Sequence, residues 1–434
     1  MIYPRLLLSK DLLTDDGVIF ISIDENEVDN LSKICTEIFG ERNHICKFIW
    51  KSKLGKVGTT SLISTVHEYI LCFAKKIENV HFKTIQNVTE GRKENLRQWG
   101  IADRREDRPS MYYPITIDGI TVYPTREDGT DGRWRVGEDM AKQLLDEGRL
   151  ELNYNKGKYS IYRTFPPGTS NIPYDTLLLD SIGTTAKGAT MLKTLEMNKM
   201  FDYSKPTELI EHFAMLCTDS SDIVMDFFSG SGTTAQAIMN LNVNGGKRSF
   251  IMVQLPEETD PNSEPHHAGF NYISDIGKER IRRAGSLINN MSQKKDMDLG
   301  FRVYKLDSSN MTNVFFDPEL FKQMNVEEFG NNVKPDRSSE DLLTQAMLEL
   351  GIELSAKIET ESIENNPVSI VDDGYLVACL SNSCSESIIT ALAKREIKPT
   401  YAVIRNGPGM TDQMLSNIEQ IFKTYSPGTE IRLI

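Results

Sequence analysis

Residues Gly230 to Thr234, with the sequence GSGTT, follow an apolar run that includes Asp226 and precede a helix-like stretch. Glycine lets the backbone approach a ligand closely, and the N–H groups at the start of a helix attract an anionic group. Because no lysine follows the glycines, the phosphate-binding loop of ATP- and GTP-hydrolysing proteins is excluded. The segment therefore predicts a ligand that lies over a helix beginning near Thr233.

A second part of this site is expected at the end of the next strand. The run SFIMVQL contains Gln254, which stands 22 residues after Gly232. In a doubly wound sheet, a side chain at that place holds the ribose of a nucleoside. The spacing Gly230-x-Gly232-x-x-Ala235 also fits the dinucleotide fingerprint, so spacing alone leaves NAD and S-adenosylmethionine both open. Glycines that only make a tight turn are the alternative, but the polar residues gathered here favour a ligand site.

The segments around the glycine turn are typical of an α/β protein. Periodic apolar positions predict helices over 25–40 and 205–217. Short apolar, β-branched runs predict strands, some of them buried on both faces. The expected strands are 18–24, 44–53, 67–76, 222–228 and 249–255, of which the first and the last two are expected to be buried on both faces.

The composition restricts the class of protein. The 434 residues are 39% hydrophobic and 26% charged, as in a globular protein, and no run of about 20 apolar residues predicts a membrane span. A net charge of −13 excludes a protein that coats nucleic acid through bulk positive charge, although a local basic surface is still allowed. The six cysteines lack Cys-x-x-Cys spacing, so we expect neither disulfides nor a metal site. Reducing cytoplasm is the expected location.

Several motifs together resemble one known family. The stretch FDYSKPTELI, the turn DFFSGSGTTA and the run SFIMVQLPEE look like the cofactor half of the β-class amino-methyltransferases, specifically the modification subunits of type III restriction systems. The segments MIYPRLLLSKDLL, ERIRRAG and GFRVYKLDSSN resemble the same family in order. The resemblance implies a Rossmann-like, S-adenosylmethionine-dependent methyltransferase fold in the permuted β-class order.

The resemblance also implies how the chain is divided. Residues 1–84 would form the target-base side of the methyltransferase domain, and 166–329 would form its S-adenosylmethionine-binding half. A target-recognition region would be inserted at 85–165, and a small α/β interaction domain would occupy 330–434. The implied partners are double-stranded DNA, a second copy of the chain in a homodimer, and a restriction subunit.

The inserted region is rich in arginine and aromatic residues. Arginine binds guanine edges or phosphates and aromatic rings stack on bases, so this composition predicts a DNA-facing surface. Pairing of the arginines with neighbouring acids on a solvated surface is the alternative. The candidates are Arg92, Arg97, Arg104, Arg105, Arg108, Arg133, Arg135, Trp99, Tyr112, Tyr113 and Trp134.

In the family, the glycine turn holds S-adenosylmethionine and the Lys-Pro helix start closes over the amino-acid end of the cofactor. The N–H groups of Thr233 and Thr234 would receive the methionine carboxylate, and Phe227 or Phe228 would cover the adenine. By resemblance the cofactor site consists of Lys205, Pro206, Thr207, Asp226, Phe227, Gly230, Gly232, Thr233, Thr234 and Gln254.

The family orients its acceptor base with the motif Asp-Pro-Pro-Tyr, which does not occur in the 434 residues. The motif's acid and a proline carbonyl accept hydrogen bonds from the adenine amino group, and its tyrosine stacks on the flipped base. In the permuted order it stands upstream of MIYPRLLLSKDLL, whereas the partial match Asn171-Ile172-Pro173-Tyr174 lies in the wrong place. We therefore predict no catalytic residue. The chain is expected to be an N-terminally truncated product, or half of a split enzyme that a separate N-terminal fragment completes.

Three functions remain open on these grounds. The first is a site-specific DNA adenine-N6 methyltransferase subunit of a restriction-modification system, weak by itself. The second is a catalytically inactive module that binds the cofactor or DNA. The third is an NAD-dependent oxidoreductase, which only the glycine spacing supports.

Overall fold

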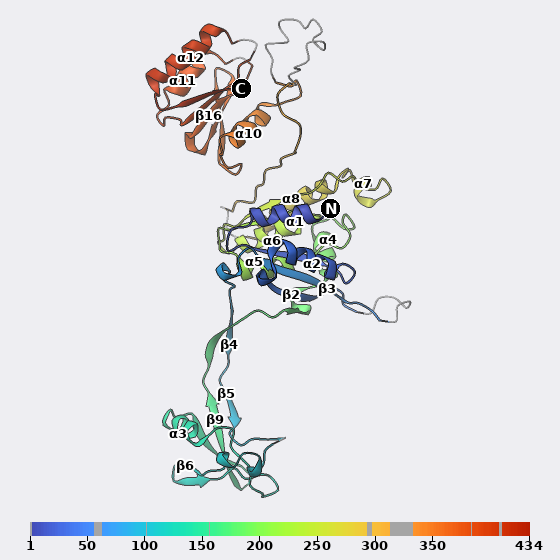
Figure 1. The fold of residues 1–434 in the computed structure, drawn as a ribbon, viewed down its shortest axis with the longest axis vertical. Coiled ribbons are helices and arrows are strands. Elements are labelled where there is room, and N and C mark those ends of the chain that lie inside the picture. The colour runs from blue at the N-terminus through green and yellow to red at the C-terminus, as the bar shows by residue number, and fades with distance from the viewer. Residues whose placement is uncertain are drawn as a thin grey trace. The chain divides into compact units, whose positions relative to one another are not determined.

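The computed structural model describes residues 2–55, 63–100, 102–155, 157–292, 297–312, 333–382, 384–407 and 410–434. The chain divides into two compact units, Met1–Gly300 and Phe301–Ile434 (Figure 1). The domain boundary expected at 329–330 falls in 313–332, outside the described residues. No helix in the described part of the chain is long and apolar enough to span a bilayer.

The first sheet of the first unit has the strand order β1-β3-β2-β11. Strand β3 is antiparallel to both β1 and β2, and β11 is parallel to β2. Apolar residues of α1, α2, β1 and β3 form one core. The expected helix and three strands of this region are confirmed as α2, β1, β2 and β3. The bounds are α1 Ile2–Leu12, β1 Val18–Ile23, α2 Val28–Phe39, β2 His44–Lys51, β3 His67–Ala74 and β11 Leu177–Leu178.

A second, two-stranded parallel sheet carries the glycine turn. Strands β12 and β13 pair in register, and α6 connects the end of β12 toward β13. Helix α6 packs against α5 and α8, which buries its residues from Thr233 to Met239. The bounds are α4 Thr185–Thr194, α5 Thr207–Cys217, β12 Ile223–Asp226, α6 Thr233–Asn242, β13 Ser249–Met252, α7 Glu264–His267 and α8 Ile273–Met291.

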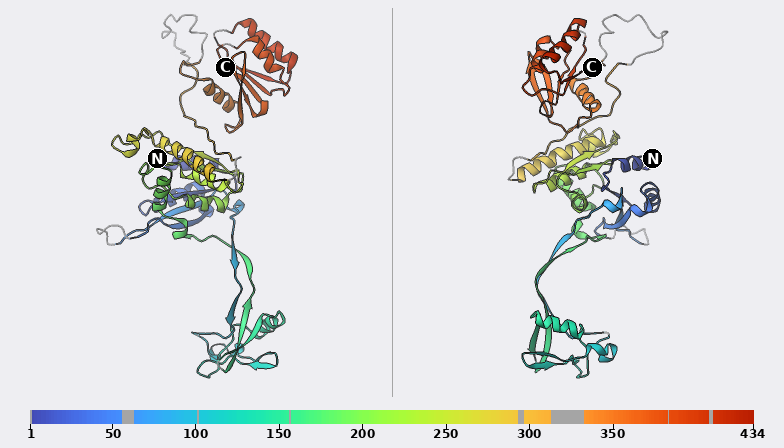
Figure 2. Two further views of the ribbon diagram at one scale, coloured as in Figure 1. Left: turned by 180° about the vertical axis from the view of Figure 1, so that it is seen from behind. Right: turned by 60° about the vertical axis from the view of Figure 1, so that its left-hand side comes forward.

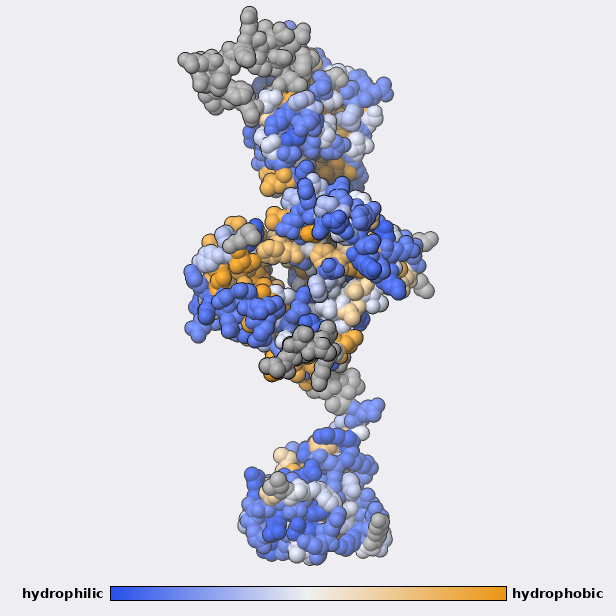
Figure 3. Space-filling view, turned by 90° about the vertical axis from the view of Figure 1, so that its right-hand side faces the viewer, coloured by the Kyte–Doolittle hydropathy of each residue, from blue (hydrophilic) through white to orange (hydrophobic). Residues whose placement is uncertain are grey.

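The prediction that β1, β12 and β13 are buried on both faces is wrong. Ile223 of β12 is 65% exposed, Ile251 of β13 is 46% exposed, and β1 has only one fully buried residue. Among the described strands, β1 pairs with β3 alone and β12 pairs with β13 alone, so each ends its sheet. A strand with no neighbour on one side and an uncovered face keeps apolar side chains at the surface. Hydrophobic residues are visible on the surface of this unit in Figure 3.

Strands β4 and β10 form an antiparallel ribbon through which the chain enters and leaves a region with its own core (Figure 2). That core gathers apolar residues of the sheet β5-β9-β8, of α3 and of the hairpin β6-β7. The bounds are β4 Ile85–Thr89, β5 Arg92–Asn95, β6 Ile115–Ile117, β7 Ile120–Val122, α3 Glu138–Asp146, β8 Leu150–Asn155, β9 Lys158–Phe165 and β10 Gly168–Ile172.

The second unit is built on a mixed five-stranded sheet in the order β14-β15-β16-β17-β18. Strands β16, β17 and β18 run parallel, while β14 and β15 form an antiparallel pair. Two apolar clusters pack the sheet, one with α11 and α12 and the other with α10. The bounds are α10 Ser339–Glu349, β14 Ile358–Ile363, β15 Asn366–Val371, β16 Leu376–Cys379, α11 Glu386–Ala393, β17 Tyr401–Ile404, α12 Asp412–Tyr425 and β18 Glu430–Leu433.

Candidate functional site

The glycine turn between β12 and α6 has the shape that the sequence predicts. Gly230 and Gly232 both have left-handed backbone angles, with φ of 48° and 75°. A Cβ atom at Gly232 would stand 3.1 Å from the backbone oxygen of Gly277 in α8, so a larger residue would be strained and crowded. Helix α6 begins at Thr233, and no side chain caps its first turn. The first N–H groups of α6 are therefore suited to receive an anionic group of a ligand.

The Asp226 carboxylate is fixed by both sides of this turn. Its Oδ1 atom accepts from the backbone N–H of Phe228 at 3.1 Å, and its Oδ2 atom accepts from the Thr234 hydroxyl at 2.6 Å. Asp226 thus ties the end of β12 to the first turn of α6. A carboxylate held in this way has a fixed direction, as a hydrogen-bond acceptor for a ligand requires.

Gln254 also holds the turn. Its Oε1 atom accepts from the backbone N–H of Gly230 at 2.8 Å. The side chain that was predicted to bind a ribose therefore lies beside the glycine turn. In the structure its oxygen is used to hold the backbone of that turn.

The Lys-Pro segment begins α5 as expected. Pro206 is the N-cap of α5, and Thr207 is buried at its first position. The Lys205 ammonium lies 2.5 Å from a carboxylate oxygen of Glu68 in β3 and 4.8 Å from the ring centre of Trp50 in β2. Sequence reasoning missed Glu68 and Trp50, because a single acid or tryptophan in a strand gives no local signal of a distant lysine.

Phe227 and Phe228 differ in their surroundings. Their ring centres are 5.2 Å apart. Phe227 packs against the core of α1, α2, β1 and β3, whereas Phe228 is 55% exposed. Of the two rings that were expected to cover an adenine, Phe228 is the one with a free face.

A buried arginine lies behind the turn, and sequence reasoning missed it. Arg280 of α8 is fully buried, and its Nη1 atom donates toward the hydroxyl oxygens of Ser204, Ser231 and Thr233. Its Nε–H donates to the side-chain oxygen of Gln236 at 2.9 Å. The stretch ERIRRAG contains this arginine, but nothing in the stretch indicates which arginine points inward.

These contacts bring the predicted cofactor residues together in one region. Asp226, Gly230 and Gln254 are linked to each other through the turn. The Ser204 and Ser231 hydroxyls lie 3.1 Å apart, so the segment before Lys205 meets the same turn. Within the described residues, no cluster of His, Cys, Asp and Glu side chains could hold a metal ion.

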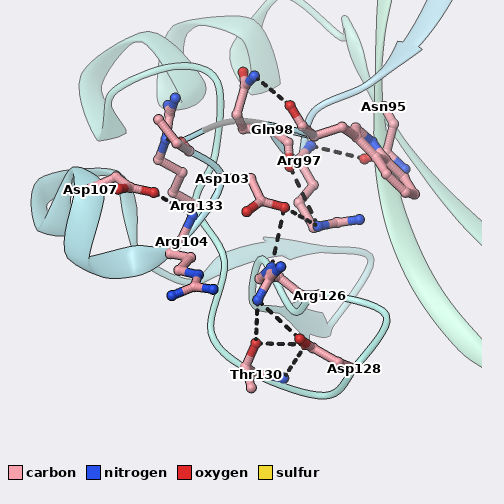
Figure 4. Close-up of polar contacts among 12 residues, drawn as sticks. Asn95, Arg97, Gln98, Asp103, Arg104, Asp107, Arg126, Asp128, Thr130 and Arg133 are labelled. Atoms are coloured by element: carbon pink, nitrogen blue, oxygen red, sulfur yellow. Dashed lines mark hydrogen bonds and ion pairs between the residues drawn. The ribbon is translucent and has the colours of Figure 1, made fainter.

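Several arginines of the region 85–165 pair with acids. Arg126 donates to Asp103 at 3.2 Å and to Asp128 at 3.0 Å, and Arg97 lies 3.9 Å from the same Asp103 (Figure 4). The Asp128 carboxylate also accepts from the Thr130 hydroxyl, at 2.6 Å. This network supports the alternative in which arginines of this region stabilise the local fold.

Two other arginine candidates also pair with acids, whereas Arg92 contacts an aromatic ring. Arg105 lies 3.0 Å from a carboxylate oxygen of Asp131, and Arg135 lies 3.3 Å from one of Glu94. The Arg92 guanidinium stands 4.7 Å from the ring centre of Phe165.

Two aromatic candidates for base stacking are wrong. Trp134 and Tyr113 are buried in the core of this region. The Trp134 indole N–H donates to the Tyr113 backbone oxygen at 2.8 Å, and the Tyr113 hydroxyl donates to the backbone oxygen of Val136 at 2.6 Å. Buried polar tips with backbone partners are typical of structural aromatic residues. Trp99, by contrast, is exposed and stacks with Arg97, 4.0 Å from its ring centre.

Comparison with known proteins supports one family. Residues 1–284 match the N6/N4 methyltransferase family described as DNA methylase. The chain is 29% identical to the type III restriction-modification enzyme EcoP15I Mod subunit of Escherichia coli, across 100% of this chain and 72% of that protein. It is 31% identical to the StyLTI Mod subunit of Salmonella typhimurium, across 70% of this chain and 47% of that protein. Type II methyltransferase M.KpnI of Klebsiella pneumoniae is 28% identical, across 67% of this chain and 75% of that protein.

Proposed function

Because the chain belongs to the N6/N4 DNA methylase family, we propose that it provides the S-adenosylmethionine site of an enzyme that methylates the exocyclic N6 amine of adenine in double-stranded DNA. Its biological setting would be a restriction-modification system, as the names of the Mod-subunit relatives suggest. The observation that carries this proposal is the glycine turn: an uncapped helix start with the fixed Asp226 carboxylate beside it.

The residues present fit S-adenosylmethionine. The N–H groups at the start of α6 would receive the methionine carboxylate, and the left-handed glycines would leave space for the nucleoside. Phe228 would cover the adenine, and Lys205 and Pro206 would close the amino-acid end. The bound cofactor supplies the methyl group, while the residues of this chain bind and orient it. The proposed site consists of Lys205, Pro206, Thr207, Asp226, Phe227, Gly230, Gly232, Thr233, Thr234 and Gln254, together with Phe228 as the ring over the adenine.

The orientation of the acceptor base would come from residues outside this sequence. The 434 residues contain no Asp-Pro-Pro-Tyr. In addition, β1 and β12 each pair on one side only among the described strands, and apolar residues of β12 and β13 are exposed. An open strand edge with an apolar face is what an added strand from another segment would cover. We therefore propose that a segment with the acceptor motif pairs with these edges.

Without that segment, activity would be low. A hydrogen bond to a charged group contributes roughly 1.5–3 kcal/mol, and stacking on a base contributes roughly 1–3 kcal/mol. Loss of both would reduce the rate on the order of a hundredfold to ten-thousandfold, at about 1.4 kcal/mol per factor of ten. Alone, the chain would then behave as a module that binds the cofactor. This second candidate function is favoured by the missing motif.

Two measurements test this proposal. Calorimetric titration is expected to show binding of S-adenosylmethionine and no binding of NAD, and NAD binding alone would favour the oxidoreductase. Transfer of radiolabelled methyl groups to a DNA duplex is expected only after a fragment with the Asp-Pro-Pro-Tyr motif is added, and a duplex with N6-methylated adenines should accept none. Rapid methylation by the chain without a fragment would contradict the need for this segment.

DNA binding and assembly are further parts of the proposal. Residues 85–165 would read the target sequence, through arginines and aromatic rings that the ion pairs and the core leave available, such as the exposed Trp99. The acidic unit from 330 to 434 would contact a second copy of the chain or a restriction subunit, because carboxylates repel DNA phosphates. Light scattering of the purified chain would test the dimer.

A further inference from the structure

We propose that Arg280 is a positioning residue, whose buried positive charge fixes the glycine turn and favours the carboxylate of S-adenosylmethionine at the start of α6. This inference rests on the proposed function, because it assigns a role toward the proposed cofactor.

The geometry places Arg280 between the two segments of the candidate site. Its Nη1 atom lies 2.9 Å from the hydroxyl oxygen of Ser204, the residue before Lys205. The same atom lies 2.8 Å from the hydroxyl of Ser231 in the turn and 2.6 Å from that of Thr233, the first residue of α6. One guanidinium therefore holds the Lys-Pro segment, the turn and the helix start against each other.

The charge of Arg280 has only neutral partners among the described residues. Its four acceptors are three hydroxyls and the Gln236 amide, and Nη2 is buried without a hydrogen-bond partner in that part of the chain. Burial lowers the pKa of Arg280 to about 10, so the guanidinium is still protonated at neutral pH. A buried cation is costly unless an anion compensates it.

The proposed ligand would supply that anion. A carboxylate at the N–H groups of Thr233 and Thr234 would be close to the residue whose hydroxyl Arg280 contacts. The arginine charge and the helix dipole would then both favour it. A neutral donor could also satisfy these hydroxyl groups without the cost of burying a charge, so the retained charge points to an anionic partner.

A matched pair of ligands tests this role. S-adenosylmethionine and its decarboxylated form differ only in the carboxylate, and their affinities are measured by calorimetry for the unmodified chain and for Arg280→Met. Arg282→Met is the control, because Arg282 lies on the same helix and its side chain is 58% exposed. We expect Arg280→Met to lower the affinity for S-adenosylmethionine by at least about tenfold and the affinity for the decarboxylated ligand by less than about threefold.

Equal weakening of both ligands would overturn the proposal, because it would show a purely structural role; unchanged affinity for both would also overturn it. If Arg280→Met fails to fold by circular dichroism, Arg280→Lys decides the question. Lysine keeps the charge but cannot reach all four acceptors. We therefore expect a smaller loss of affinity that is confined to S-adenosylmethionine. Equal losses of affinity for both ligands would again contradict the role. Failure of the unmodified chain to bind either ligand would contradict the proposed function instead.

Discussion

The Thr234 hydroxyl donates to the Asp226 carboxylate at 2.6 Å and joins the end of β12 to the first turn of α6. This bond fixes the spacing between the strand end and the uncapped helix start. The Phe228 N–H donates to the second carboxylate oxygen, so the protein holds both oxygens of Asp226.

Replacement of Asp226 by Asn should weaken S-adenosylmethionine binding. Phe228 and Thr234 donate to different oxygens of the carboxylate, so an amide NH2 group in place of one oxygen removes one acceptor, and the charge is lost. Loss of a charge-assisted hydrogen bond predicts about tenfold to hundredfold weaker binding. Calorimetry would measure the effect, with the exposed Asp219→Asn as control. Equal affinities for the two variants would contradict the role of Asp226.

The two adjacent phenylalanines should separate binding from stability. Phe228→Ala removes an exposed ring and is expected to weaken binding of the cofactor by about 1–3 kcal/mol, with little change in the free energy of unfolding. Phe227→Ala removes a ring that packs against the core, so it should lower the free energy of unfolding by about 2 kcal/mol. Calorimetry and urea unfolding of both variants measure the difference. The reverse pattern would show that Phe227 covers the adenine.

The open edge of β12 predicts a variant that leaves the fold stable but lowers the methyl transfer restored by the added fragment. Ile223 is 65% exposed, so Ile223→Asp should change the stability of the chain by no more than about 0.5 kcal/mol. An aspartate on this face should prevent an added strand from packing, and the motif-bearing fragment should then restore little methyl transfer. Thr360→Asp, at an exposed position of β14 in the other unit, is the control. Full restoration with Ile223→Asp would place the fragment elsewhere.

The ion pair between Lys205 and Glu68 should stabilise the fold. Both side chains are partly buried, and their charged atoms lie 2.5 Å apart. A double-mutant cycle with Lys205→Met and Glu68→Gln is expected to give a coupling free energy of about 1 kcal/mol in urea unfolding. The exposed pair of Lys76 and Asp15 should give a smaller value. No coupling between Lys205 and Glu68 would mean that solvent screens the pair fully.

His212 should make stability depend on pH. Burial lowers the pKa of His212 below its usual 6.5, and its buried Nε2 atom has no hydrogen-bond partner among the described residues. Because the folded pKa lies below the unfolded one, the unfolded chain binds the proton first. The contribution of His212 is present above pH 6.5 and is lost as the pH falls below it.

His212→Phe should remove this part of the pH dependence. The ring packs edge-on against Tyr174 and Phe213, where a phenyl group would fit without a proton to bind. The difference in unfolding free energy between variant and unmodified chain should grow in favour of the variant from pH 7.5 to pH 5.5. A constant difference across this range would show that His212 titrates as it does in the unfolded chain.

Local features of the candidate site could be predicted from the sequence. The start of a helix near Thr233 follows from residue types within one short segment, and the structure confirms it. The left-handed angles of Gly230 and Gly232 agree with the expected close turn. The helix α2 and the strands β1, β2 and β3 were predictable for the same reason, since the pattern of apolar residues is a local property, whereas the two-residue strand β11 was not predicted.

Long-range contacts were not predictable. The sequence of β12 predicted a strand, but its exposure depends on which strand lies beside it. Trp134 and Tyr113 appeared as candidates beside arginines, yet packing places them in a core. Arg280 lies 49 residues after Ser231, so nothing local predicts their contact.

The sequence by itself determined the residue types and the local backbone of the glycine turn, because glycine, apolar runs and helix starts act over a few residues. Only the tertiary structure decided which side chains support that turn and which strand edges stay open. Both depend on the packing of segments that are far apart in the chain, and the free energy of such packing comes from surfaces that meet only after folding.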